Sequence, residues 1–147
     1  MRRDYVTLNV RHVGRDDETL PTVVLTVDEQ TETLEQRLVT ADGDGIEADR
    51  LDVVFRLKGP VEDDATGVFS LSDRITGEFV LEVNADAADV LDLVDGARTD
   101  DADGCYRVVV RHDSEDVATY EKRMLLVYDG EGGLLRGHSL IPSGVEL

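Results

Sequence analysis

The sequence contains a single cysteine, Cys105, and no tryptophan among its 147 residues. A lone cysteine excludes a disulfide framework and is typical of a reducing compartment. No apolar run approaches the length of a membrane span, and the residues after Arg2-Arg3 alternate with polar ones, as an export signal would not. We therefore expect residues 1–147 to form a single domain in the cytoplasm, with no membrane partner.

Motifs that mark metal sites are absent as well. Zinc sites are built from close ligand pairs such as C-x2-C or H-x3-H, and His12, His112, His138 and Cys105 form no such pair. The two acidic turns, 40–45 and 99–104, have threonine where a calcium loop begins with aspartate, and both lack the glutamate at the twelfth position. We expect no metal site, and only hydrated cations held non-specifically.

Catalytic and nucleotide-binding signatures are missing too. No serine lies in a G-x-S-x-G turn, and neither a P-loop nor a G-x-G-x-x-G segment occurs. Cys105 follows Gly104 at the start of a valine-rich stretch, which is typical of a small half-buried side chain and not of an activated thiol. We expect no catalytic residue and no cofactor.

Positive charge is scarce, and lysine is nearly absent. The chain has 33 acidic residues against 15 Lys and Arg, of which only Lys58 and Lys122 are lysines, for a formal net charge of −18. No basic stripe or aromatic platform is visible, so we expect no nucleic-acid partner. Such a charge destabilises a compact chain by self-repulsion at low ionic strength, and molar salt screens it. The composition therefore predicts a protein built for concentrated salt.

The two ends of the chain, "MRRDYVTLNV" and "EKRMLLVYDGEGGLLRGHSLIPSGVEL", together with the acidic composition, resemble an uncharacterised family of small acidic haloarchaeal proteins. The resemblance extends over the whole chain and implies a cytoplasm that accumulates salt. It carries no activity, ligand or catalytic residue that could be transferred to this sequence.

Apolar and polar residues alternate along most of the chain, which predicts a strand-rich fold. The predicted strands are Tyr5–Val13, Thr22–Val27, Leu51–Leu57, Val68–Ser72, Glu78–Val83, Tyr106–His112, Val117–Tyr128 and Leu134–Ile141. Two segments follow a helical period: residues 31–39, and residues 84–97 with Asn84 or Asp86 as N-cap and Gly96 as the stop. The sequence predicts an α+β fold, with an antiparallel-dominated sheet, two short helices and a C-terminal β-meander over Tyr106–Ile141.

A sequence pattern that occurs twice, here called the internal echo, indicates that part of this fold is duplicated. Residues 23–28 (VVLTVD) match residues 79–84 (FVLEVN), and each is followed by a predicted helix, a T-x-D-x-D-G turn and a strand. The order predicts ββαβ units at 5–57 and 67–112, followed by C-terminal strands at 117–141. The alternative is chance similarity, because acidic glycine turns and valine-rich strands are common in this chain.

The tripeptide Val-Arg-His occurs at 10–12 and again at 110–112, which raises the question of a paired site. Alternate residues of a strand share a face, so His12 and His112 continue apolar stripes while Arg11 and Arg111 point to solvent. We interpret both copies as strand ends.

An alternative function is a small-molecule, anion-binding or catalytic domain, with a site in a sheet cleft. The residues that would line it are Arg56, Arg107, Arg111 and His138. Convergent guanidinium groups without carboxylate partners would indicate such a site, whereas cross-strand carboxylates beside each arginine would favour a non-catalytic module.

Residues 134–147 carry only two charged side chains, Arg136 and Glu146, in a chain otherwise rich in carboxylates. The segment is either the last core strand or a surface covered by another protein, because interface cores are depleted of charge. The candidate interaction surface comprises Tyr120, Met124, Tyr128, Leu134, Arg136, His138, Leu140 and Ile141. The leading hypothesis is a non-catalytic protein-interaction or assembly module, homodimeric through its C-terminal strands.

Overall fold

The computed structural model describes residues 6–11, 21–27, 51–59, 65–77, 79–98, 104–112 and 115–141. Its strands are β1 (Val6–Arg11), β2 (Thr22–Val27), β3 (Leu51–Leu57), β4 (Thr66–Asp73), β5 (Phe79–Asp86), β6 (Tyr106–His112), β7 (Glu115–Lys122) and β8 (Leu126–Tyr128). The helix α2 (Ala87–Ala97) and the 3-10 helix η3 (Arg136–His138) complete the described elements. The bounds of β2, β3 and β6 are those that the alternation predicts.

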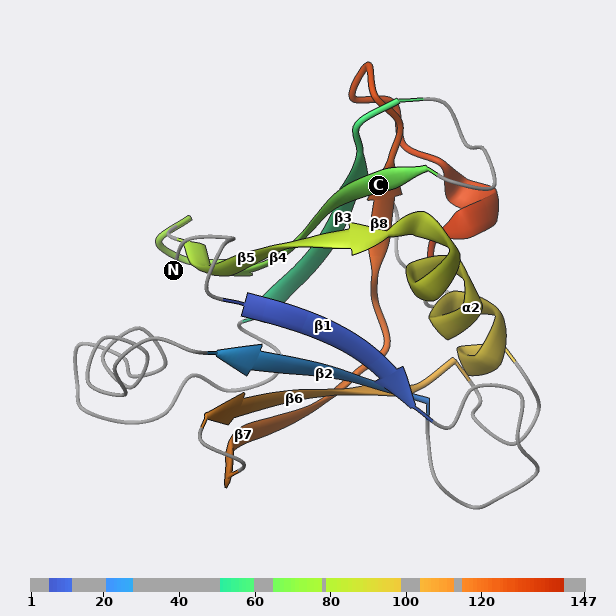
Figure 1. The fold of residues 1–147 in the computed structure, drawn as a ribbon. Helices are drawn as coiled ribbons and strands as arrows, with labels where there is room; N and C mark the ends of the chain where they lie inside the picture. Colours follow the sequence, from blue (N-terminus) through green and yellow to red (C-terminus); the bar gives the residue numbers. More distant parts are fainter. Residues whose placement is uncertain are drawn as a thin grey trace.

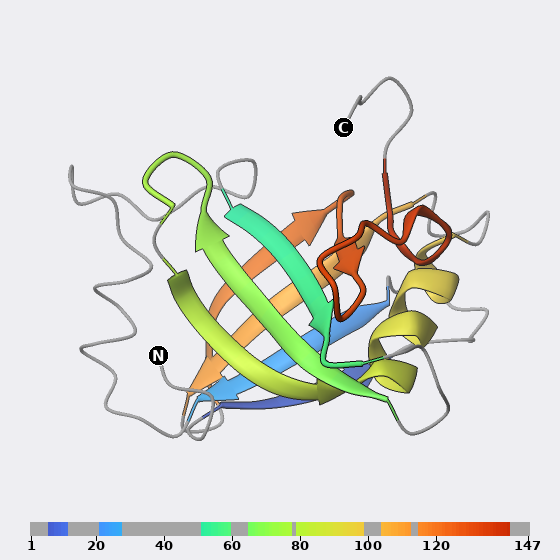
Figure 2. The same ribbon diagram turned by 90° about the horizontal axis from the view of Figure 1, so that it is seen from above.

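The strands form two four-stranded sheets, ordered β1-β2-β6-β7 and β5-β4-β3-β8. Each sheet contains one parallel pair, β2 with β6 or β3 with β8, beside antiparallel pairs. The sheets lie face to face with crossing strands, and α2 lies at one end of the two layers (Figure 1, Figure 2). The fold is α+β as predicted, but the expectation of one antiparallel-dominated sheet was wrong, because there are two mixed sheets.

Each parallel pair joins strands that are far apart in the sequence. The chain returns to the first sheet with β6, beside β2, after β3, β4 and β5 have entered the second. It then enters the second sheet with β8, beside β3. Parallel neighbours need long connections, since a tight hairpin joins only antiparallel strands. Local alternation predicts the strands but holds no information on these returns.

The space between the sheets is filled by alternate residues of their strands. Phe55 and Phe69 are partners on β3 and β4, and Leu25 and Val110 are partners on β2 and β6; all four are fully buried. From α2, the buried side chains are Ala87, Val90, Leu93, Val94 and Ala97. This alternation fixes the register, because a slip of one residue would move every core side chain to the other face.

The helix α2 begins directly after β5, with Asp86 at the N-cap position, although the Asp86 side chain makes no capping hydrogen bond. Gly96 is buried inside the helix, so the interpretation of Gly96 as its stop was wrong. The other predicted helix, residues 31–39, lies outside the described residues. Within the described part of the chain, no helix combines the length and apolarity needed to cross a membrane.

The strand order does not show the predicted ββαβ duplication. In the first sheet, β2 lies between β1 and β6. Its counterpart in the sequence echo, β5, lies at the end of the other sheet and pairs with β4. The two halves of the echo therefore enter different pairing arrangements.

The predicted strand over 117–128 is divided between the two sheets. Tyr120 and Lys122 are buried on β7, whereas Leu125 and Val127 are buried at β8, so the alternation changes phase between Lys122 and Leu125. The chain passes from one layer to the other at this point. The C-terminal meander that the sequence predicts is therefore not formed, and β6 and β7 make an antiparallel pair with a register shift after Val110.

Residues 134–140, here called the C-terminal cover, lie along the free edge of β8 in place of the predicted strand over Leu134–Ile141. Antiparallel bridges join Tyr128 to Leu134 and Leu125 to Leu140, and η3 lies between them. The backbone N–H groups of Leu125 and Leu140 each donate to the other residue's carbonyl, at 3.0 and 2.8 Å. The cover thereby occupies hydrogen-bonding groups that an open sheet edge would expose.

Ser139 fastens the C-terminal cover to two other elements. Its hydroxyl accepts a hydrogen bond from the Val127 N–H at 2.9 Å and donates to the Leu135 carbonyl at 2.8 Å. Its carbonyl accepts a hydrogen bond of 2.6 Å from the guanidinium of Arg98, which directly follows α2. The segment that is poor in charge is thus bound to its own chain.

Candidate functional site

The arginines of β6 lie on the outer face of the first sheet, each beside a carboxylate of β7. The Arg107 guanidinium lies 3.4 Å from Glu121, and Arg111 Nε lies 2.9 Å from Asp116. Both partners stand opposite their arginine in the antiparallel register of β6 and β7. These two guanidinium groups are therefore engaged within the sheet.

Arg56 lies on the outer face of the other sheet, with its guanidinium carbon 5.7 Å from the centre of the Tyr128 ring. The two residues are neighbours in the parallel pairing of β3 and β8. His138 is exposed on η3. The structure thus brings Arg56 together with Tyr128, and does not bring it together with Arg107 and Arg111, which lie on the other sheet.

The residues of the predicted C-terminal interaction surface are divided between core and surface. Leu140 and Tyr120 are 5% and 7% exposed and belong to the hydrophobic core of the single chain. The half-buried members are Met124, Tyr128, Leu134 and Ile141, and the exposed members are Arg136 and His138. The charge-poor segment is therefore in part core, which favours the simpler of its two interpretations for Leu140.

A different apolar surface lies on the outer side of the β5-β4-β3-β8 sheet, here called the outer sheet face. Four half-buried apolar side chains point outward from it: Val54 on β3, Val68 on β4, and Leu126 and Tyr128 on β8. Cross-strand pairing places Val54 beside Leu126, and Arg56 between Val68 and Tyr128. Of these, only Tyr128 was among the residues of the predicted interaction surface.

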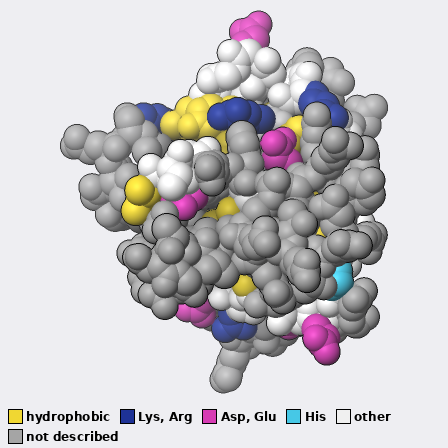
Figure 3. All heavy atoms as spheres, turned by 90° about the vertical axis from the view of Figure 1, so that its left-hand side faces the viewer, with side chains coloured by type: hydrophobic (Ala, Val, Ile, Leu, Met, Phe, Trp, Pro, Cys, Tyr) yellow, Lys and Arg dark blue, Asp and Glu magenta, His cyan; other side chains and the backbone are white. Residues whose placement is uncertain are grey.

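The outer sheet face also carries cations that have no carboxylate partner among the residues that the structure describes. Lys58 is exposed and its ammonium donates to the Asn84 side-chain carbonyl at 3.0 Å, while Arg56 stacks over Tyr128. Among the described residues, neither has a carboxylate partner, unlike Arg107 and Arg111. In the view of Figure 3, hydrophobic side chains lie beside Lys and Arg side chains in the upper part of the molecule, where Figure 1 places this sheet.

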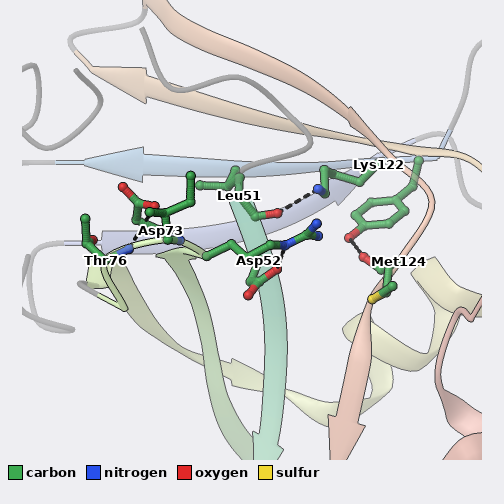
Figure 4. A network of polar contacts seen from close by, with 9 residues as sticks. Leu51, Asp52, Asp73, Thr76, Lys122 and Met124 are labelled. Atoms are coloured by element: carbon green, nitrogen blue, oxygen red, sulfur yellow. Dashed lines mark hydrogen bonds and ion pairs between the residues drawn. The ribbon is translucent and has the colours of Figure 1, made fainter. Parts of the chain in front are cut away.

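A network of buried polar contacts lies where β3 begins (Figure 4). The ammonium of Lys122, which is 7% exposed, donates to the Leu51 carbonyl at 2.6 Å, and the Tyr106 hydroxyl donates to the Met124 carbonyl at 2.6 Å. Burial raises the pKa of Tyr106 well above its ordinary value, so the hydroxyl keeps the proton that it donates. These contacts satisfy backbone carbonyls where the chain changes layers, and their role is structural.

Asp73 closes the turn between β4 and β5. Its carboxylate accepts hydrogen bonds from the N–H groups of Ile75, at 2.9 Å, and Thr76, at 3.4 Å. Arg74 in the same turn pairs with Asp52 of β3 at 3.0 Å. Asp73 therefore serves as a turn residue.

The described residues contain no group of three or more His, Cys, Asp or Glu side chains arranged to hold a metal ion. Cys105 is half-buried and is the single cysteine of the sequence. The arrangement offers surfaces for binding and no constellation of nucleophile, base and orienting group within these ranges.

A family model described as "Family of unknown function (DUF5793)" matches residues 1–147. No curated protein and no solved structure matches the chain.

Proposed function

The chain belongs to this family of unknown function, and on the geometry of its surface we propose that it is a non-catalytic protein-interaction module that docks a partner on the outer sheet face. The observation that carries the proposal is the coincidence of half-buried Val54, Val68, Leu126 and Tyr128 with two cations that have no described carboxylate partner. The four side chains project from strands that pair with one another in one sheet, so the surface is formed within the single chain.

The part of the outer sheet face formed by β3 and β8 has a composition close to that of interface cores. Such cores are enriched in aromatic side chains and arginine and depleted of acidic ones. Arg56 on β3 and Tyr128 on the end strand β8 stand next to each other there, and their stacking holds both side chains in place. In a chain with a net charge of −18, apolar and cationic side chains on the two central strands of a sheet face support a role in binding.

A salt-rich cytoplasm as the working environment is part of the same proposal. The net charge of −18 supports it, since molar salt screens the repulsion between carboxylates that such a surface generates. The single cysteine supports a reducing compartment. In this environment long-range charge attraction is weak, and docking depends on apolar contact and short-range pairing.

The ion pairs of Arg107 and Arg111 favour the interaction module over the alternative, an anion or small-molecule site lined by sheet arginines. A guanidinium already paired at 2.9 Å must break that pair before it can bind another anion. The cations of the outer sheet face, Arg56 and Lys58, lie beside apolar side chains on an open sheet surface, which suits a protein partner.

Site-specific photo-crosslinking tests the proposal. The full chain carries p-benzoylphenylalanine in place of Val54, with the same substitution at the exposed Thr119 of β7 as the matched control on the other sheet. We expect position 54 to cross-link in an extract of the source cells to one defined protein, and the cross-link to form again from purified components. Equal cross-linking from positions 54 and 119, or none from position 54, would contradict the proposal.

A further inference from the structure

The outer sheet face is polarised across its strands. Arg56 is an outward cation of β3, and Lys58 directly follows that strand. The outward residues of β5 include the carboxylates Glu82 and Asp86. Between them, the residues of β4 on this side are uncharged: Thr66 is exposed, Val68 and Ser72 are half-buried, and Ser70 is buried. The acidic Asp52 at the far end of β3 is already paired with Arg74. A positive column and a negative column therefore flank a neutral strand.

The strand register places opposite charges at matching heights. Thr66 stands opposite Asp86 in the β4–β5 pairing, and it accepts the backbone hydrogen bond of Lys58 at 3.0 Å on its other side. Val68 stands between Arg56 and Asn84, with Glu82 and Asp86 two positions along β5 in either direction. Among the described residues, Glu82 and Asp86 have no cationic partner.

We infer that the occupant of the outer sheet face is a second copy of this chain, related to the first by a two-fold axis that runs along β4. The inference rests on the proposed function and names its partner. A two-fold rotation about an axis in the interface keeps each position along β4 and exchanges its two sides. The positive column of each copy then faces the negative column of the other, with Lys58 over Asp86 and Arg56 between Glu82 and Asp86.

Other placements of the axis are opposed by charge. An axis along β3 would lay Arg56 of one copy on Arg56 of the other, and an axis along β5 would do the same with Glu82. Like charges brought together across an interface cost several kcal/mol. On the β4 axis Val68 packs on its own counterpart, Val54 lies against the apolar stem of Glu82, and each ion pair is formed twice.

Concentrated salt favours this association, because it screens the long-range repulsion between the two chains more than it weakens ion pairs in direct contact. At low ionic strength two chains of net charge −18 repel over long range, and in molar salt the Debye length falls to about 3 Å, so only pairs in direct contact still interact. The paired columns are such contacts. The dimer is therefore expected in molar KCl.

Sedimentation velocity of the purified full chain in molar KCl, over a concentration series, tests the inference. We expect a monomer–dimer equilibrium. Arg56→Glu should raise the dissociation constant of the dimer by at least about tenfold, because the new carboxylate would face the carboxylates of Glu82 and Asp86 in the other copy. Glu82→Arg should raise it similarly. The double variant Arg56→Glu with Glu82→Arg should recover most of the affinity, since the two columns are complementary again with their signs exchanged. Arg107→Glu, on the outer face of the other sheet, is the matched control and should leave the constant unchanged.

Circular dichroism confirms that each variant is folded before its mass is measured. A dimer that is insensitive to Arg56→Glu, or a double variant as weak as the single ones, would overturn the inference. A chain that stays monomeric at every concentration would also overturn it. If that monomer still cross-links from position 54 to a different protein, the proposed function stands and only the identity of the partner is wrong.

Discussion

Lysine occurs at two positions in a chain that otherwise uses arginine as its cation. The ammonium of Lys122 donates to the Leu51 carbonyl in a buried position, and the flexible stem of Lys58, the residue after β3, reaches Asn84 on β5. Lysine is a compact point charge on a flexible stem, whereas arginine presents a planar fork. The compact ammonium suits Lys122, which donates to a backbone carbonyl where the chain passes between the sheets. The long flexible stem suits Lys58, which extends across β4 to Asn84.

Gly67 on β4 leaves room for the ring of Phe55, and we predict that Gly67→Ala destabilises the protein. A Cβ at position 67 would lie 2.7 Å from Cζ of the buried Phe55 ring and would also meet the carbonyl of Arg56. Overpacking of this kind costs about 1–3 kcal/mol. Urea unfolding in molar KCl should show a lower free energy of unfolding for the variant.

The matched control is Gly137→Ala in η3, where an added Cβ meets no atom within 4 Å. Its free energy of unfolding should equal that of the wild type or exceed it slightly, since alanine reduces the entropy of the unfolded chain. Strand propensity alone would make alanine better than glycine at position 67 as well. An unchanged or higher stability of Gly67→Ala would therefore contradict the packing described here.

The repeated Val-Arg-His segment shows what alternation predicts at the residue scale. Arg11 is exposed and Arg111 points outward to Asp116, as expected for strand residues, and His112 is half-buried; His12 lies outside the described residues. The partner of Arg111 could not be predicted. A register shift after Val110 sets Asp116 opposite Arg111, and such a bulge leaves no periodic signal.

At the scale of elements, strands on a single sheet were predictable, and those that change sheet were not. The inward residues of β2, β3 and β6 keep one phase from end to end, although β2 and β6 also bury Val24 and Val109 on their other face, and the bounds of all three strands follow from the pattern. The change of phase between Lys122 and Leu125 is present in the sequence. It was not predicted, because Lys122 is a charged residue at an inward position and interrupts the apolar pattern. The burial of Lys122 depends on the Leu51 carbonyl of β3, which is far away in the sequence.

The outer sheet face could have been suspected from doublets of apolar residues. Val54 follows Val53, and Val68 precedes Phe69, so each strand has an apolar side chain on both faces at that point. A strand with one wet face should show strict alternation. What local alternation could not provide is the parallel pairing of β3 with β8, which brings Leu126 and Tyr128 onto the same surface.

Helix α2 carries a row of carboxylates on its exposed side, and we predict that Asp89→Asn stabilises the protein at low ionic strength. The row consists of Asp86, Asp89, Asp92 and Asp95 at intervals of three residues, with no basic residue in the last turn. Burial, and then the charges of Asp86 and Asp92, raise the pKa of Asp89 above its ordinary value of 3.8. Relief of two like-charge neighbours on a helix is worth about 0.5 kcal/mol.

The dependence on pH follows from the direction of that shift. A carboxyl group whose pKa is raised by folding destabilises the native state when it is ionised, and this cost appears as the pH rises from 3.8 through the raised pKa. Thermal unfolding in dilute buffer at pH 7 should therefore give a higher Tm for Asp89→Asn, with the difference shrinking as the pH falls toward 3.8. A difference of the same size at low pH and in molar KCl would show that charge is not its cause.

On the scale of the whole molecule, the two layers are closed by elements from different parts of the chain. The C-terminal cover lies on the edge of β8, α2 lies across one end, and Arg98 ties these two elements together through Ser139. Leu135 and Leu140 of the C-terminal cover thus pack against the core of their own chain. The outer sheet face, in contrast, keeps half-buried apolar side chains that the described elements do not cover, and its polarity across β4 is the basis of the proposed pairing with a second copy.

The charge of the whole molecule sets the conditions in which this fold is stable, and we predict that Tm rises with KCl concentration. The chain carries a net charge of −18 on an accessible surface of 8468 Å², and the described ion pairs join side chains that are at least a quarter exposed. Exposed pairs contribute only about 0–1 kcal/mol each, so they do not offset the repulsion between the excess carboxylates.

Circular dichroism from dilute buffer to molar KCl should show the steepest rise of Tm at low concentration, where the Debye length shortens fastest. Sucrose at matched osmolality is the control, because it is excluded from the surface without screening charge. If sucrose raises Tm as much as KCl does, or if KCl leaves Tm unchanged, charge repulsion does not limit the stability of this fold.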